Sequence, residues 1–572
     1  MDYAAARKWV NTRPIFLVEI TWGAYVYRFS TKAINLSDGS LNYAFLGGMD
    51  EPEIDFKLQK YGFDAEGDSI PFALVFPVDI SEEISKGNEI EGSSVELSFV
   101  LEDLRTGETA QNYDDRFILF KGIVAAPIYG YPERPAGYVE FSAEEKLIID
   151  SVSLLDTIVG TNGRMDNADI SNDEYAASSP FTLIITDGIV DVADVHFGKR
   201  WPIILGFPGV SRSSITGSLS NLKATPVYAI NYSNSVPDNL PMFLLIAGHA
   251  VEATSVKIWD SEGNSDTGTV GHFVGSKGNI FAYTIIEFAS TTLKSAIVDE
   301  QIEYWATWDT GGGLPSVMEG GPIEGGADIC LWCLSQVSRD IDWSAWGSVT
   351  PLLNKYKFAG YIIDDQIEPI QFLEENILPF LPIEITIGPQ GLKPILNLPI
   401  AVDELLSMDT IIAGEDWSRD GPIVTETNYE DICNQLDLSY AKNCMKDSYT
   451  GTIRIVPDKV RAGRWTEFSN DFSQLSFRLF GRRQKSLSAD YIYDVGTATK
   501  VARDYIKMYA LPTRTATYNA PTRYGYLNLG DIITLSDSSI HLSSVKAQII
   551  GKSWQRNHWS FQVELADNII LQ

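Results

Sequence analysis

The stretch DVGTATKVARDYIKMYALP at residues 494–512 predicts one amphipathic helix and the point where it ends. Proline at 512 ends the helix, because proline cannot continue it and disfavours helical backbone in the preceding residue. Apolar side chains recur three and four residues apart before that point, as on one helix face: Ala498, Val501, Ala502, Tyr505, Ile506 and Tyr509. A single helix is therefore expected just before the C-terminal strands.

Four strand-like runs follow this helix. In the second and fourth runs apolar and polar residues alternate, which is typical of a half-buried antiparallel sheet. Gly530 and Gly551 are expected at a turn or bulge, because glycine tolerates a positive φ. Together these residues predict a helix docked on a small closing β-barrel. The four runs are TRTATYNA (513–520), YLNLGDIITLSD (526–537), SVKAQIIGKSWQR (544–556) and HWSFQVELAD (558–567).

The composition of the whole chain predicts a mainly β, multidomain protein. Its 572 residues are enough for roughly three to five hydrophobic cores. Aromatic residues make up 11% of the chain and there are 45 glycines, a combination that favours many short strands. The expected fold class is mainly β with an α+β middle domain and small β-barrels at both ends.

Changes of pattern divide the chain into six expected segments. The first contains a hairpin that turns at Gly23 and an acidic stretch, 81–92, expected as an exposed loop or short helix. The segments are a first β-barrel at 1–150, a loop-rich connection at 151–200, an inserted β domain at 201–310, a glycine-rich linker at 311–326, an α+β middle domain at 327–459 and a C-terminal β-barrel with one helix at 460–572.

The middle segment shows helical rather than strand periodicity. Helices are expected at 327–337, 348–357 and 368–381, and the last of them stops near Pro382. A hairpin is expected at 383–399. Helices followed by a hairpin indicate a layered α+β arrangement rather than alternating β-α units.

The net charge of −32 and the pI near 4.5 argue against sequence-specific nucleic-acid binding, which needs clustered Lys and Arg to neutralise phosphate. The first residues, MDYAAARKWVNTRPIF, lack the apolar run of a signal peptide. No apolar run is long enough for a membrane-spanning helix. Four cysteines are too few for a disulfide framework and fit synthesis in a reducing compartment.

Several phrases of the sequence resemble the tail hub proteins of long-tailed phages. They are FLVEITWGAYVYRFST (16–31), FKGIV (120–124), RWPIILG (200–206), PVYAI (226–230) and LNLGDIITL (527–535). The resemblance implies a baseplate or tail-tip hub in which the first and last barrels pair. Three chains would then present six similar modules to a six-fold tail tube.

The resemblance also implies partners, a location and a role. The partners are two further copies in a homotrimer, a distal tail or tail tube protein, a tip or central fibre protein, and the tape measure protein. The location is the virion tail tip or baseplate, after assembly in the host cytoplasm. The role is structural: host attachment and an ejection channel for the genome. A trimer would carry a charge of about −96, three times −32.

The four cysteines allow more than one interpretation. Cys330 and Cys333 form a CxxC, and with Cys433 and Cys444 they match the ligand count of a structural zinc or an iron–sulfur cluster. Some tail-tip proteins of long-tailed phages bind such a cluster. The favoured interpretation is free thiols packed in a core, because Cys330 and Cys333 lie one helical turn apart among apolar residues. No cofactor is therefore expected.

No motif predicts a catalytic site, and no enzyme is expected. Two adjacent carboxylate pairs, Asp364 with Asp365 and Glu374 with Glu375, are the candidates for glycosidase chemistry, but an acidic chain offers many such pairs. The five histidines are scattered and lie outside known catalytic motifs: His196, His249, His272, His541 and His558.

Two further groups of residues have alternative interpretations. Asp166, Asp169, Asp173 and Glu174 suggest a calcium loop, but their spacing departs from the EF-hand pattern and favours a polar surface loop. Aromatic residues on strands suggest sugar stacking or, more commonly, cross-strand packing: Trp22, Tyr25, Tyr27, Trp305 and Trp308. A tail-associated wall or glycan hydrolase and a receptor- or carbohydrate-binding protein, with its site in the 201–310 insertion, remain the alternatives to a hub.

Overall fold

The computed structural model describes residues 11–145 and 323–566 with short gaps, residues 203–206, and six strands between residues 225 and 308. The gaps in the two long ranges are 59–67, 110–111, 338–339, 363–367, 426–429, 444–447, 458–465 and 470. The described residues form several sheets and a group of helices, so the expected mainly β fold with an α+β middle part is confirmed. No helix among these residues is long and apolar enough to cross a membrane.

The first sheet has eight strands and begins with the expected hairpin, whose turn places Gly23 at φ +60°. A short helix, α2 (Ile80–Ser85), occupies the acidic stretch and is capped by the carboxylate of Asp79. In spatial order the strands are β3 (Ile34–Ser37), β4 (Asn42–Gly47), β2 (Tyr25–Ser30), β1 (Thr12–Trp22), β7 (Ser94–Asp103), β8 (Phe117–Tyr129), β9 (Tyr138–Glu144) and β6 (Ser69–Val75).

The first sheet curls until its two ends approach each other. Phe76 directly follows the edge strand β6, and its ring lies 5.8, 5.2 and 5.0 Å from the rings of Trp22, Tyr27 and Phe29 on β1 and β2. These two strands lie toward the opposite edge of the sheet. The sheet therefore has a barrel-like shape. Aromatic side chains, and not backbone hydrogen bonds, connect the β6 edge with β1 and β2.

The C-terminal sheet curls for a different reason. Its edge strands, β20 and β21, follow each other in the chain with only residues 413–417 between them. Gly551 lies at a register shift in β28, which confirms the expected bulge. In spatial order the strands are β20 (Thr410–Ile412), β27 (Ile532–Asp537), β28 (Leu542–Gln555), β29 (His558–Leu565), β26 (Arg514–Ala520) and β21 (Ser418–Thr425).

Helix α5 packs against both α6 and α7, and α6 also packs against a two-stranded hairpin, β18–β19. Helix α6 begins earlier than expected because Asp342 accepts a hydrogen bond from the backbone N–H of Ala345, at 2.9 Å, and so caps it. The elements are α5 (Gly326–Val337), α6 (Trp343–Leu353), α7 (Pro369–Asn376), β18 (Ile383–Gly388), β19 (Gly391–Leu396), α8 (Leu398–Glu404), and the paired strands β10 (Ile203–Leu205) and β17 (Gly360–Ile362).

Helix α10 (Val495–Tyr509) confirms the helix expected from the opening stretch, and Asp494 caps it. Its small apolar residues pack against strands β22 and β23, so the expected docking on the C-terminal barrel is wrong. Ala498 and Ala502 are buried in the same core, and their small side chains let the helix lie close to this sheet. The four-stranded sheet is β24 (Thr466–Ser469), β23 (Ser448–Val456), β22 (Gln435–Asn443) and β25 (Gln484–Ala489), with α9 (Asp471–Phe480) beside it.

The six strands between residues 225 and 308 form a closed barrel in which each hydrogen-bonded neighbour is antiparallel. In order around the barrel they are β11 (Thr225–Ala229), β12 (Met242–Ala247), β15 (Ala282–Phe288), β14 (Ser265–Val274), β13 (Val256–Trp259) and β16 (Tyr304–Trp308). Short 3-10 turns complete the described elements at η2 (Leu378–Phe380), η3 (Thr522–Tyr524) and η4 (Ser538–Ile540).

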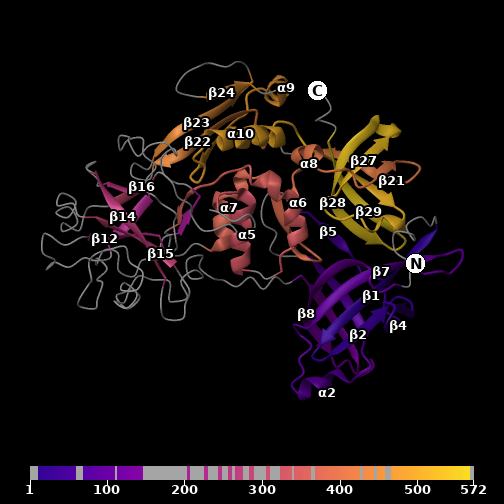
Figure 1. Cartoon of the computed structure of the whole chain (residues 1–572). Helices are drawn as coiled ribbons and strands as arrows, with labels where there is room; N and C mark the ends of the chain where they lie inside the picture. Colours follow the sequence, from indigo (N-terminus) through magenta and orange to yellow (C-terminus); the bar gives the residue numbers. More distant parts are fainter. Residues whose placement is uncertain are drawn as a thin grey trace, which may run out of the picture.

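Two large cores hold these elements together. One core contains the buried residues of the first sheet and of the C-terminal sheet. The other contains the middle helices, the hairpin, the four-stranded sheet and α10. Figure 1 shows the indigo first sheet directly below the yellow C-terminal sheet, with the middle helices beside them. The two ends of the chain therefore build a single packed unit.

Candidate functional site: the junction of the first and last sheets

A short strand from the first part of the chain joins the C-terminal sheet. Strand β5 (Asp55–Lys57) pairs antiparallel with β28, and Phe56 lies opposite Lys552. Two more backbone hydrogen bonds extend the pairing, from Leu58 N to Ile550 O at 2.8 Å and from Trp554 N to Ile54 O at 2.9 Å. The two sheets are thus linked by backbone as well as by side chains.

An aromatic cluster fills the space between the two sheets. Phe16 of β1 lies 5.3 Å from Trp554 and 6.4 Å from Trp559, measured between ring centroids. Phe99 of β7 lies 6.0 Å from Trp559. Phe16, Phe99 and Trp559 are fully buried, and aromatic pairs of this kind stabilise by about 0.5–1.5 kcal/mol beyond the burial of their area. The junction is therefore a packed core rather than a surface contact.

Lys552 of β28 is the most unusual residue of the junction, because only 2% of its surface is exposed. Its ammonium donates a hydrogen bond to Gly525 O at 2.6 Å. It also lies 4.8 Å from the ring centroid of Trp559 and 5.3 Å from that of Phe117. Burial lowers the pKa of Lys552 to about 7, helped by Lys393, while the negative charge of Asp531 acts in the opposite direction.

The first sheet, the hairpin and the C-terminal sheet meet beside this lysine. Lys393 of β19 donates to Leu529 O at 3.2 Å, and burial lowers its pKa. Asp531 accepts from the backbone N–H of Asn528 at 2.8 Å, and burial raises its pKa. The cavity here has a volume of about 30 Å³, room for about one water molecule. The cavity beside Lys552 therefore holds little more than water, although a larger cavity of about 210 Å³ adjoins it at Glu145 and residues 387–389.

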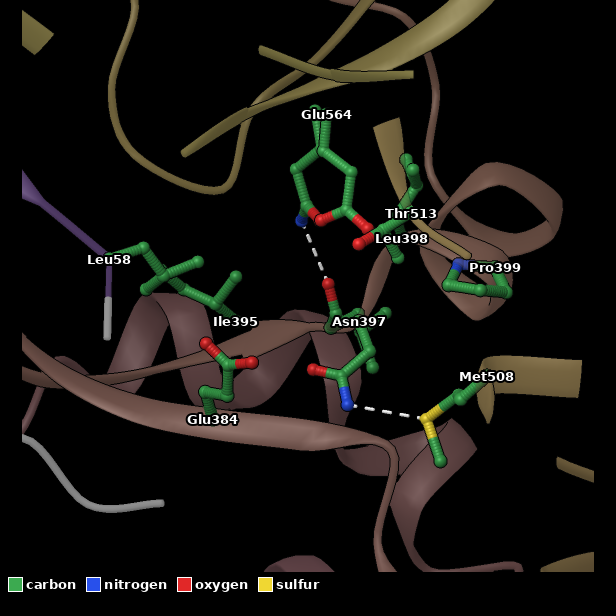
Figure 2. A pocket seen from close by; sticks show the side chains of 11 residues that line it. Leu58, Glu384, Ile395, Asn397, Leu398, Pro399, Met508, Thr513 and Glu564 are labelled. Carbon is green, nitrogen blue, oxygen red and sulfur yellow. Dashed lines mark hydrogen bonds between the residues drawn. The ribbon is translucent and has the colours of Figure 1, made fainter. Parts of the chain in front are cut away.

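A second small cavity lies where the hairpin, α10 and the C-terminal sheet approach each other (Figure 2). Asn397 directs its amide at the sulfur of Met508, 3.3 Å away. Two buried carboxylates, Glu384 and Glu564, also line this cavity. Its volume of about 20 Å³ is that of about one water molecule, so a sugar ring does not fit between these carboxylates.

The structure places three of the four cysteines in the interior. Cys330 and Cys333 lie on α5, and Cys433 precedes β22; all three are buried free thiols. Burial raises the pKa of all three thiols, that of Cys433 to about 11. Metal ligation requires thiolates, which this environment disfavours. Cys444 lies outside the described residues, so the four-thiol metal site stays a hypothesis.

Buried neutral thiols should resist modification. In a Cys444→Ser variant we expect no thiol to react rapidly with a disulfide reagent in the folded protein, and three to react after unfolding. A colorimetric thiol assay with and without guanidinium measures both numbers. Rapid reaction of a thiol in the folded variant would contradict the buried positions of these cysteines.

The candidate carboxylates and histidines do not gather in one described place. Glu374 and Glu375 lie on α7, where Glu375 accepts a hydrogen bond from Gln371 at 3.0 Å. His541 is exposed in a turn with φ +59°, and His558 lies on β29. For the other candidates the structure gives no side chain, because they fall outside the described residues or side chains: Asp364, Asp365, His196, His249 and His272.

The aromatic strand residues of the first sheet show cross-strand packing. The ring of Tyr27 on β2 lies 5.9 Å from that of Trp22 on the neighbouring β1. It also lies 6.4 Å from that of Tyr25 on its own strand. Trp305 and Trp308 lie on β16, of which the structure describes the backbone only. The proposed calcium-loop residues fall outside the described residues: Asp166, Asp169, Asp173 and Glu174.

No local pattern in the sequence marks the residues of the junction, although the resemblance implied that the first and last barrels pair. Strand β5 has three residues, too short to give a periodic signal. Lys552 occupies a position in a strand-like run where a charged residue is expected to face solvent. The one available signal was the aromatic character of SWQRNHW (553–559), which predicts a packed hairpin but not its partner.

The fold and its junction define a multidomain β scaffold whose first and last sheets are joined in one core. No protein-family model and no curated protein matches this chain. Solved structures do match. One is the tail protein from Neisseria meningitidis MC58, with 9% identity, a TM-score of 0.36 and 97% of each chain covered.

Two other matches are similar in kind. The 43 kDa tail protein of prophage MuSo2 from Shewanella oneidensis has 9% identity and a TM-score of 0.31, over 94% of this chain and 98% of that chain. A chain of the virion of a native gene transfer agent particle has 11% identity and a TM-score of 0.40, over 67% and 88%. Two of the three matches are described as tail proteins, and the third belongs to a virion particle. With TM-scores below 0.5, they assign no role to any residue.

Proposed function

We propose that this chain is a structural tail protein of a phage-like particle, a hub that caps a six-fold tail tube and adapts it to a three-fold tip or central fibre. The observation that carries the proposal is the single core shared by the first and last sheets. Such a unit offers two curled β modules per chain in a fixed relative position. Three chains would then offer six modules to a six-fold partner.

The rigidity of the junction supports this role. A symmetric adaptor must hold its two tube-facing modules at a constant angle, because a flexible pair would lose the match to the tube. Backbone pairing of β5 with β28 and the buried aromatic cluster both oppose relative movement of the sheets. The role needs interfaces and geometry rather than a catalytic group.

The net negative charge of the chain is suited to a channel through which DNA passes. Three copies would carry about −96, three times −32, and a field of that sign repels DNA instead of binding it. The proposed partners are the distal tail or tail tube protein on one side, the tip or central fibre protein on the other, and the end of the tape measure protein in the lumen. The proposed place is the tail tip of the virion, reached from the host cytoplasm during assembly.

The direct test of this role uses the particle that carries the gene. Without this chain, tails should lack the tip and remain unable to eject DNA, and an epitope tag on the chain should be found at the tail end by immunogold microscopy. Supplying the intact chain from a plasmid is the control and should restore the tip. The proposal would be overturned if particles without this chain kept a complete tip. It would also be overturned if the gold label lay along the tail shaft.

A further inference from the structure

Strand β25 lies at an open edge of the four-stranded sheet. Among the described residues it pairs with β22 alone, in parallel, and the register runs without a shift from Gln484 opposite Gln435 to Ala489 opposite Tyr440. An edge strand carries a row of backbone N–H and C=O groups that its own sheet does not use. The free side of β25 is therefore a template for a further strand.

The hydrogen bonds to β22 show which backbone groups point outward. In a parallel pair, alternate residues of a strand direct their N–H and C=O to the same neighbour. Gln435 N donates to Arg483 O at 2.9 Å, so every second residue from Arg483 onward faces β22, whereas Gln484, Ser486 and Ser488 face away. These three residues are exposed, and within the part of the chain that the structure describes their backbone groups have no partner.

The edges of the first and C-terminal sheets carry features that hinder strand addition. Strand β6 contains Pro71, and β21 contains Pro422 within a register shift. Strand β20 has only three residues, and the edge of β3 is covered where Tyr113 N donates to Ser37 O at 3.0 Å. By contrast, β25 has six residues with neither a proline nor a register shift.

The start of β25 is held rigidly in place. Asn434 is fully buried; its Nδ2 donates to Gly481 O at 2.7 Å and its Oδ1 accepts from Arg483 N at 2.8 Å. Further along the strand, Leu487 packs against the core beneath the sheet. An edge that is already ordered loses little entropy when a partner binds to it.

The charge at this edge differs from that of the chain as a whole. Strand β25 and the three residues before it contain three basic and no acidic side chains, on a chain of net charge −32. Arg482 is exposed, and the ammonium of Lys485 lies 5.9 Å from the ring centroid of Tyr505 on α10. Neither forms an ion pair within the described residues. Asp437, on the neighbouring β22, is paired with Arg454 at 2.7 Å. A partner of this edge should therefore carry negative charge.

We propose that β25 is a strand-addition site that takes up a short, extended, acidic segment of a partner protein as a fifth strand of the sheet. The backbone of that segment would pair with Gln484, Ser486 and Ser488, and its carboxylates would lie beside Arg482 and Lys485. This surface belongs to the four-stranded sheet and not to the junction of the first and last sheets. The inference therefore goes beyond the proposed hub role.

The test uses the full chain and a fluorescent peptide of about eight residues in which valine and glutamate alternate. Fluorescence anisotropy should show saturable binding, and hydrogen exchange should show new protection of β25. A peptide of the same length with lysine in place of glutamate should bind at least about 10-fold more weakly, because it would meet like charges. Absence of saturable binding of the acidic peptide at about 1 mM, or equal binding of both peptides, would overturn the proposal.

Matched variants separate the edge from the rest of the surface. Ser486→Pro removes an outward N–H that β22 does not use and should weaken binding of the acidic peptide by about 10-fold or more, whereas Ser486→Ala should bind as the wild type does. Unchanged hydrogen exchange of β22 shows that the sheet is intact. Undiminished binding by Ser486→Pro with an intact sheet would contradict strand addition.

Charge reversal gives a result that misfolding cannot produce. Arg482→Glu/Lys485→Glu should weaken binding of the glutamate peptide and strengthen binding of the lysine peptide, because the sign of the charge beside the edge is inverted. The same anisotropy titrations measure both changes. A variant that still prefers the glutamate peptide would show that these two cations do not select the partner, and the acidic segment would be wrong.

Discussion

Replacing Trp559 with alanine should loosen the first and last sheets together, although the residue belongs only to the last. Its side chain is fully buried and contacts Phe16 and Phe99 of the first sheet as well as Trp554 beside it. Removing a buried tryptophan costs about 3–5 kcal/mol through lost burial and the cavity left behind. Because the two sheets share one core, both sheets should lose stability.

Hydrogen exchange read by mass spectrometry resolves the two sheets separately. In Trp559→Ala, peptides from β1 and β7 and peptides from β28 and β29 should lose protection by a similar amount. Trp343→Ala is the control, since Trp343 is half exposed at the start of α6 and its removal should leave both sheets unchanged. Loss of protection confined to the C-terminal strands would contradict the shared core.

The stability of the junction should rise between pH 7 and pH 9. The folded-state pKa of Lys552, about 7, lies below the ordinary lysine value of 10.5. In this interval the unfolded chain therefore binds the proton that the folded chain releases, and stability increases with pH. One such proton changes the free energy of unfolding by up to about 1.4 kcal/mol per pH unit. Lys393, whose pKa is also lowered, acts in the same direction.

Substituting Lys552 with methionine removes its share of this pH dependence. Denaturant unfolding at several pH values should show a steeper rise for the wild type than for Lys552→Met. Lys355→Met, at an exposed position, should keep the wild-type slope. Equal slopes for the wild type and Lys552→Met would show that Lys552 titrates normally in the folded chain.

Local sequence patterns predicted well those helices and strands in which the spacing of apolar residues repeats several times. Helix α10 and strands β26, β28 and β29 lie close to their expected positions because apolar spacing repeats over several turns or pairs. The patterns predicted the wrong partner for α10, the C-terminal barrel instead of the four-stranded sheet. Its stripe of alanines and aromatic residues fits a sheet closely, but nothing local distinguishes the four-stranded sheet from the C-terminal one.

The junction was harder to predict for two physical reasons. It joins residues roughly five hundred positions apart, such as Phe16 and Trp554, and no local pattern carries such a pairing. It also buries Lys552, contrary to the general preference of lysine for the surface. The buried charge becomes understandable only when Gly525 O and the rings around it are seen together.

The mass of the full chain in solution tests the proposed hub most directly. One chain weighs 63.4 kDa, so the account predicts a light-scattering mass near three times that value, about 190 kDa. Negative-stain images of the same peak should show a three-fold ring with a central hole. A mass of one chain at every concentration, with compact particles that have no hole, would contradict the hub.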